Sequence, residues 1–171
     1  MKKEKFKKIP ISKFISDKEL SKINKIINSS ESVDVAYDRI ETLLDDNFKV
    51  KGLGTNRLIF IHKKDKFKDL VFKVAGDSHG VEANYREFYN GDLDKRLTFS
   101  YSISDDGLFL VQERVTVFDS KMLKEHKKEV RKILKHLSHK LLLVDCRISN
   151  FKNFGIRKNG EIVVLDNGDT V

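Results

Sequence analysis

The side chains best suited to chemistry gather in the last thirty or so residues of the chain. An apolar run ends at Asp145, and the amides Asn150 and Asn153 follow it. A second β-rich run, after a hairpin turn, leads to Asp166 directly before Asn167-Gly168. Carboxylate and amide oxygens suit Mg²⁺, which takes water and phosphate as its remaining ligands. We therefore expect a magnesium site here; the plain alternative is a hairpin with one loop aspartate and one turn aspartate.

A lysine in the middle of an apolar run is the second unusual feature. Residues 70–75 read L-V-F-K-V-A, which predicts a strand with Lys73 at its centre. Burying an unpaired ammonium is costly, so Lys73 must reach water along its stem or be paired. The alternative is an edge-strand lysine that faces solvent. A short predicted helix at 81–89 offers two acidic candidates, Glu82 and Glu87.

The elements that must position these residues follow from periodicity and turn signals. Residues 1–12 are expected to be a flexible basic start. Helices are predicted at 18–27, with a cap at Ser16-Asp17, then at 32–44, 81–89 and 120–137, the last a single long helix capped by Ser120. Strands are predicted as two runs within 48–61 and then at 70–75, 97–102 and 108–113, before a hairpin that turns at Asn159-Gly160.

Composition limits the class of protein. A length of 171 residues with 39% apolar content predicts one domain, or one domain with an appendage. No run approaches the ~20 apolar residues that span a bilayer, and no apolar segment follows the basic start as in a secretory signal. The single cysteine, Cys146, excludes an internal disulfide and a multi-cysteine zinc site. The expected compartment is the cytoplasm, and the oligomeric state stays open.

Positive charge is concentrated in two segments, residues 1–30 and 121–140, each with a net charge of +6. Such surfaces could meet nucleic acid, an acidic protein or anionic lipid. We favour solvated helix faces, because lysine dominates over arginine and aromatic side chains are few. His126, His136 and His139 are interpreted as surface residues, since no cysteine or carboxylate follows at metal-binding spacing.

Taken in order, these features resemble the protein-kinase-like fold over residues 48–168. The order is a glycine turn between two strands, a lysine in the third strand, an acidic helix, two more strands, a helix, and then Asp, Asn and Asp. The resemblance implies an α+β protein with a five-stranded antiparallel N-lobe sheet and a helix. A minimal C-lobe of one long helix and a β-hairpin would follow. The implied domains are a basic helical extension at 1–34, the N-lobe at 35–115 and the truncated C-lobe at 116–171.

The same resemblance implies how ATP would be held. Gly52, Gly54 and Thr55 would belong to the phosphate-covering glycine loop, where missing side chains let the backbone approach phosphate. Lys73 would reach the α and β phosphates, with Glu87 as its helix partner and Glu82 as the second choice. Gln112 would take the gatekeeper place, and the backbone from Glu113 to Val115 would bond the adenine edge.

The catalytic and metal residues are implied in the same way. Asp145 matches the catalytic-loop aspartate, and Asp166 matches the aspartate that holds Mg²⁺. Asn150 has the usual five-residue offset from Asp145, whereas Asn153 has the usual thirteen-residue offset to Asp166. We favour Asn153 slightly as the second metal ligand.

Several positions depart from the family pattern. Arg57 stands at the third glycine, Leu143-Val144 at the usual His-Arg pair, and Asn167 at the usual phenylalanine. The chain stops three residues after Gly168, without an activation segment or the remaining C-lobe helices. Compact kinase-like proteins that lack the C-terminal part of the C-lobe are typical of phages, so the resemblance implies a phage or prophage origin.

Three functions are therefore expected. The first is an ATP- and Mg²⁺-dependent phosphotransferase of the Ser/Thr protein-kinase type that modifies or controls a host protein. It is expected because Lys73, Glu87, Asp145, Asp166 and one of Asn153 and Asn150 are all present. The second is an inert, pseudokinase-like chain that grips a protein partner. The third is a basic protein that binds nucleic acid through 1–30 and 121–140.

Overall fold

The computed structural model describes residues 9–141 and 150–165 of the chain. It shows an α+β protein with a five-stranded antiparallel sheet, as the sequence predicts. Asp145 and Asp166, expected to act in catalysis and metal binding, lie outside the described residues. Of the candidate site, the structure describes Lys73, Glu87, Asn150 and Asn153.

The helices are α1 (Asp17–Ser29), α2 (Val33–Leu44), α3 (Ser78–Gly91), α4 (Ser120–Glu125) and α5 (Lys127–Leu141), with short 3-10 helices η1 (Ile11–Lys13), η2 (Asp65–Phe67) and η3 (Phe151–Asn153). The strands are β1 (Phe48–Leu53), β2 (Arg57–His62), β3 (Leu70–Ala75), β4 (Ser100–Ile103), β5 (Phe109–Glu113), β6 (Thr116–Val117), β7 (Phe154–Ile156) and β8 (Ile162–Val164).

The large sheet has the strand order β1-β2-β3-β5-β4, and every neighbouring pair is antiparallel. Strand β3 is therefore central, flanked by β2 and β5, and its bounds match the predicted run. Lys73 pairs with Ile59 on one side and Leu110 on the other. The expectation of an edge-strand lysine is excluded.

Local capping explains where the helices begin. Ser16 and Glu19 form a reciprocal capping box at α1. At α3, the carboxylate of Asp77 accepts a hydrogen bond from the N–H of Gly80 at 2.8 Å. At α4, Asp119 accepts from the N–H of Met122, so the cap is Asp119 and not Ser120 as predicted.

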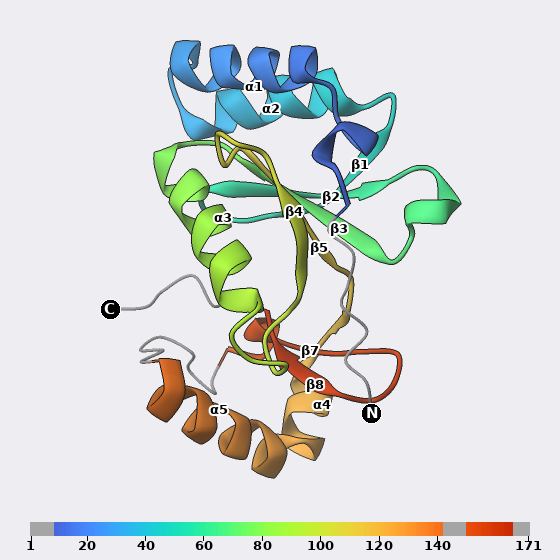
Figure 1. Ribbon diagram of the computed structural model, residues 1–171, viewed down its shortest axis with the longest axis vertical. Helices are drawn as coiled ribbons and strands as arrows, with labels where there is room; N and C mark the ends of the chain where they lie inside the picture. Colours follow the sequence, from blue (N-terminus) through green and yellow to red (C-terminus); the bar gives the residue numbers. More distant parts are fainter. Residues whose placement is uncertain (1–8, 142–149, 166–171) are drawn as a thin grey trace.

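Helices α1 and α2 lie across one end of the sheet, and α3 runs along its side (Figure 1). Phe14 and Ile23 from the N-terminal region share one buried cluster with Ile40 of α2 and with Phe48 and Phe72 of the sheet. The expected boundary near residue 34 stays a prediction, but the helices on both sides of it bury their apolar faces in this common core.

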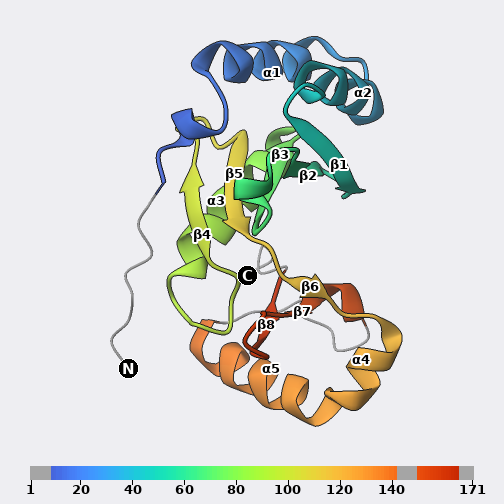
Figure 2. The same cartoon turned by 90° about the vertical axis from the view of Figure 1, so that its right-hand side faces the viewer.

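A second buried core lies at the opposite end, between α4, α5 and the smaller sheet of order β6-β7-β8 (Figure 2). It consists of Leu97, Phe118, Val130, Ile133, Leu137, Phe154, Ile162 and Val164. Leu97 precedes β4 in the chain, yet it forms a parallel bridge with Val164 of β8. The two sheets are thus linked by backbone pairing as well as by the chain that leaves β5.

An ion pair between the two sheets adds a further connection. The guanidinium of Arg157, in the β7–β8 turn, takes both carboxylate oxygens of Glu113, with Nη2–Oε1 at 2.6 Å and Nε–Oε2 at 2.9 Å. Arg157 also donates to the carbonyls of Lys95 and Leu97. Such two-pronged pairs fix orientation as well as distance.

Three predicted elements require correction. The single long helix is two helices, because His126 leaves the helical conformation (φ −99°, ψ 10°), while Leu123 and Val130 keep their apolar spacing across the break. The C-terminal hairpin gains a third strand, β6, which pairs with β7. Strand β4 begins at Ser100 and not at 97, because the backbone of Arg96 and Thr98 bonds to Val164 instead.

None of the described helices has both the length and the apolar character needed to cross a membrane.

The start of α3 packs against the β1–β2 turn too closely for a side chain at Gly80. A Cβ there would lie 2.2 Å from the carbonyl oxygen of Asn56, whereas one at Gly52 would meet nothing within 4 Å. We expect Gly80→Ala to lower the free energy of unfolding by about 1–3 kcal/mol, as overpacking does. Gly52→Ala, the matched control, should stay within about 0.5 kcal/mol of wild type. Urea denaturation measures both, and equal stability of the two variants would contradict the close approach.

Candidate functional site

The centre of the candidate site is an ion pair between β3 and α3. The carboxylate oxygen Oε2 of Glu87 accepts a hydrogen bond from the ammonium of Lys73. Glu87 is fully buried and Lys73 is 9% exposed. Glu82, the second choice as partner, instead pairs with Arg86 on the exposed side of the same helix. The expected partner of Lys73 is confirmed, whereas the role of the pair in binding phosphate stays a prediction.

Two further side chains converge on the same carboxylate. Arg57 Nη2 lies 2.8 Å from Glu87 Oε1, and Gln112 Nε2 donates to Oε2 at 3.3 Å. The Arg57–Glu87 contact is an ion pair. Each carboxylate oxygen of Glu87 therefore meets one cation.

Asn84, one helical turn before Glu87, extends the network to the backbone. Its Oδ1 accepts from Arg57 Nη1 at 3.3 Å, and its Nδ2 donates to the carbonyl of Gly107 at 2.9 Å. The side of α3 that faces the sheet is a buried stripe of Gly80, Asn84, Glu87 and Gly91. The glycines let the helix approach closely, and the polar residues bind across the short gap.

Burial and charge act in opposite directions on Glu87. Burial alone would raise the pKa of its carboxyl, because a charge loses hydration there. The positive charges of Lys73 and Arg57, with their hydrogen bonds, outweigh burial and hold the pKa below the ordinary value of 4.5. Glu87 is therefore ionised at neutral pH.

The glycine turn between β1 and β2 is held at its base and exposed at its tip. The N–H of Gly54 donates to the carbonyl of Arg57 at 2.8 Å, and the hydroxyl of Tyr37 donates to the carbonyl of Gly54 at 3.2 Å. Burial, with the nearby Asp77, raises the pKa of Tyr37 to about 12, so this hydroxyl stays a donor. Gly54 and Thr55 face solvent. The tip can thus meet a ligand while its base stays fixed.

In the segment expected to bond an adenine edge, some backbone N–H groups already donate hydrogen bonds to other parts of the chain. The N–H of Glu113 donates to the carbonyl of Phe99, and the N–H of Arg114 donates to that of Asp69, both at 2.9 Å. Val115 packs on Gly155, where an added Cβ would lie 2.5 Å from the Val115 Cγ2. No partner of the Val115 N–H is seen among residues 9–141 and 150–165, which makes it the best candidate donor of this segment.

The two asparagines proposed as metal ligands lie together. Asn150 Nδ2 donates to Asn153 Oδ1 at 3.0 Å, and Asn150 Oδ1 accepts from the N–H of Lys152 as the cap of η3. The carbonyl of Asn153 accepts from the N–H of Leu165, the last described residue before Asp166. Both candidate amides thus belong to one small cluster, and the choice between them stays open.

The structure brings together only part of the expected metal site. Among the described residues, no three His, Cys, Asp or Glu side chains are grouped as metal ligands. Asp145 and Asp166, which would supply the carboxylates, lie outside those residues.

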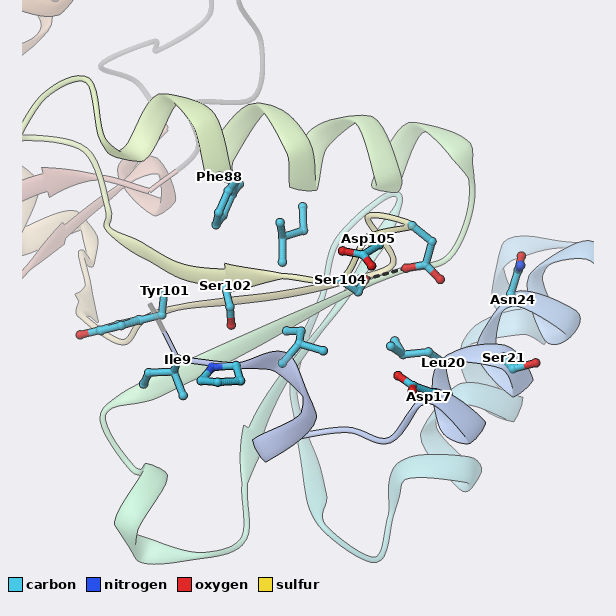
Figure 3. Close-up of a pocket in the computed structure, with 14 residues that line it drawn as sticks. Ile9, Asp17, Leu20, Ser21, Asn24, Phe88, Tyr101, Ser102, Ser104 and Asp105 are labelled. Carbon is cyan, nitrogen blue, oxygen red and sulfur yellow. Dashed lines mark hydrogen bonds between the residues drawn. The ribbon is translucent and has the colours of Figure 1, made fainter. Parts of the chain in front are cut away.

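Among the hollows formed by described residues, two that border the large sheet are not lined by Lys73. The first, of about 600 Å³, lies between α1, the N-terminal segment, α3 and β4 (Figure 3). Phe88 reaches into it from α3, and Leu20 and Asp17 reach it from α1. The second, of about 590 Å³, borders the segment after β5 and has four basic side chains in its lining, Lys51, Lys68, Arg114 and Lys158.

Sequence reasoning missed Arg57 as a partner of Glu87 and Asn84 as a partner of Arg57. Arg57 was noted only as the residue that replaces a glycine, and nothing local to it indicates a partner thirty residues away. The spacing of Gly80, Asn84, Glu87 and Gly91 by four, three and four residues was the available signal. Small and polar residues on one side of an amphipathic helix predict close packing against polar groups.

Comparison with protein-family models gives no match for this chain, and comparison with curated proteins gives none either.

Replacing Glu87 should lower the stability of the fold, because Lys73 and Arg57 lose the carboxylate that pairs with them. At pH 7 we expect Glu87→Gln to lower the free energy of unfolding by about 3–5 kcal/mol, because it leaves buried charges unpaired. The folded-state pKa lies below 4.5, so this stabilisation is complete above that pH and is lost as pH falls through the folded pKa. Urea denaturation between pH 7 and pH 3 should show the two proteins converging at low pH.

The matched control on the same helix is Glu82→Gln, which removes an exposed pair and should cost less than about 1 kcal/mol. A difference between wild type and Glu87→Gln that is independent of pH would contradict the ionised, paired state of Glu87.

Proposed function

We propose that the chain is a kinase-like phosphotransferase that uses ATP and Mg²⁺. The observation that carries the proposal is the buried Lys73–Glu87 pair, with β2 and the exposed glycine turn beside it. In phosphoryl transfer the protein acts mainly by positioning groups and stabilising charge. A fixed ammonium near a turn with exposed backbone is suited to hold a polyphosphate.

The burial of the pair supports a functional role more than a structural one. Taking two charges out of water costs about as much as their attraction returns, so a buried pair is a weak source of net stability. Strongly perturbed charged groups are also more frequent at functional sites. We infer that Lys73 is held by Glu87 so that its ammonium can meet the α and β phosphates of ATP.

The metal and the catalytic base are assigned from the motif order. Asp166 and Asn153, or Asn150 in its place, would hold Mg²⁺, which neutralises charge on the transferred phosphoryl group. Each asparagine carries an amide oxygen of the kind that a hard cation prefers, and the two side chains lie in contact. Asp145 would accept the proton of the acceptor hydroxyl, which we assign to a serine or threonine of a protein.

Nucleotide binding can be tested directly by the melting temperature. Mg²⁺-ATP at a hundred times its Kd should stabilise the wild-type chain by about 2.7 kcal/mol, because it binds the folded state alone. We expect Lys73→Met to lose this shift. The exposed Lys49 of β1 provides the matched control, and Lys49→Met should keep the shift. Transfer of the γ-phosphate to the chain itself or to a basic test protein should then be lost in Asp166→Ala.

No shift with ATP in the wild-type protein, with or without Mg²⁺, would refute nucleotide use. Equal labelling by wild type and Asp166→Ala would refute catalysis.

A second candidate function is the capture of a protein partner, and the hollow beside α1 favours it. Its rim carries Asp17, Asp105 and Asp106, and none of the described residues that line it is basic. Apolar side chains such as Leu20 and Phe88 form its wall (Figure 3). On a chain with a net charge of +8, this acidic and apolar surface is complementary to a peptide that is basic and apolar.

This candidate makes a separate prediction. A short labelled peptide of lysine and leucine should bind wild type, and the Asp17→Lys/Asp105→Lys variant should bind it roughly tenfold more weakly, because like charges repel. Asp38→Lys, on the exposed side of α2, should bind as wild type does. Fluorescence anisotropy measures the affinities. An equal loss in the Asp38 variant would show that only net charge matters, and Lys73→Met should have no effect.

A further inference from the structure

We propose that Arg57 is a positioning residue for Lys73, acting through Glu87 and tying that carboxylate to the glycine turn. The inference deepens the proposed function and rests on it, since it concerns how the phosphate-binding lysine is held. Arg57 occupies the position at which the resemblance leads one to expect a third glycine. The structure gives this departure a physical role.

The guanidinium of Arg57 contacts two side chains of α3. Arg57 Nη2 lies 2.8 Å from Glu87 Oε1, and Nη1 donates to Asn84 Oδ1 at 3.3 Å. Residues three apart on a helix share a face, and the planar fork of arginine can meet both at once. The side chain of Arg57 is 14% exposed, so the contact is largely shielded from water and salt.

The carboxylate divides its oxygens between the two cations. Oε1 faces Arg57, whereas Oε2 accepts from Lys73 and from Gln112. Without Arg57, Oε1 would be left buried without its cation, and Glu87 could rotate to share both oxygens with Lys73. Arg57 thus fixes the rotation of the carboxylate and, through it, the direction of the Lys73 ammonium.

The backbone of Arg57 connects this arrangement to the glycine turn. Its carbonyl accepts the hydrogen bond from Gly54 that closes the turn, and the residue pairs with Ala75 at the end of β3. The carbonyl of the preceding residue, Asn56, accepts from the N–H of Gly76, just before α3. A displacement of the turn is therefore transmitted to the guanidinium and onward to Glu87.

A residue that only stabilises the fold would not discriminate between parts of a nucleotide. Lys73 is proposed to meet phosphate, whereas the adenine edge is expected at the segment after β5. Loss of Arg57 should therefore weaken binding of the triphosphate and leave binding of the nucleoside alone unaffected.

The experiment measures the affinities of Mg²⁺-ATP and adenosine by calorimetry for the full chain and its variants. We expect Arg57→Met to bind ATP roughly tenfold more weakly while adenosine affinity stays within about twofold. Arg57→Lys, which keeps the charge but not the fork, should recover part of the loss. Arg57→Gln serves as the alternative if the methionine variant does not fold. Arg86→Met, on the exposed side of α3, should match wild type for both ligands.

A double-mutant cycle tests the route through Glu87. In a Glu87→Gln background, Arg57→Met should cause no further loss of ATP affinity, because the carboxylate through which it acts is gone. Additive losses, or equal losses for ATP and adenosine, would overturn the inference and leave the proposed function standing. A wild-type chain that binds neither ligand would remove the proposed function, and this inference with it.

Discussion

The burial of one carboxylate governs the arrangement of the large sheet and its helix. Glu87 is fully buried, and an ionised carboxylate without partners in such a place would cost several kcal/mol. Its partners come from three different strands, with Arg57 on β2, Lys73 on β3 and Gln112 on β5. Helix α3 can therefore dock in only one rotation and one register. The two glycines on the same side of the helix, at positions 80 and 91, make the close approach possible.

Specific contacts also fix the position of the smaller sheet relative to the large one. Arg157 takes both oxygens of Glu113, and Leu97 pairs with Val164. The amide cluster of Asn150 and Asn153 follows directly from this attachment, because β7 begins at the next residue. A chain of defined contacts thus leads from the end of β5 to the proposed metal ligands, all within the described residues.

Sequence reasoning predicted those features that depend on local pattern. The bounds of β3 follow from an apolar run, and the Asn159-Gly160 turn follows from a hairpin signal. The Lys73–Glu87 pairing, which the kinase-like resemblance implied, is present as well. It failed where distant segments decide the outcome. The two-residue strand β6 exists only because β7 lies beside it, and the break at His126 leaves the apolar period intact. Arg57 contacts a residue thirty positions away. The assignments of Asp145 and Asp166 stay predictions, because these residues lie outside the described ranges.

The attachment of the two sheets at more than one point has a mechanical consequence. A single extended linker would let one sheet swivel freely about the other. Here the crossing after β5 is joined by the guanidinium of Arg157 and by the Leu97–Val164 bridge. Torsion about the linker would have to break a desolvated ion pair and a backbone bridge together. These contacts therefore resist rotation of one sheet against the other.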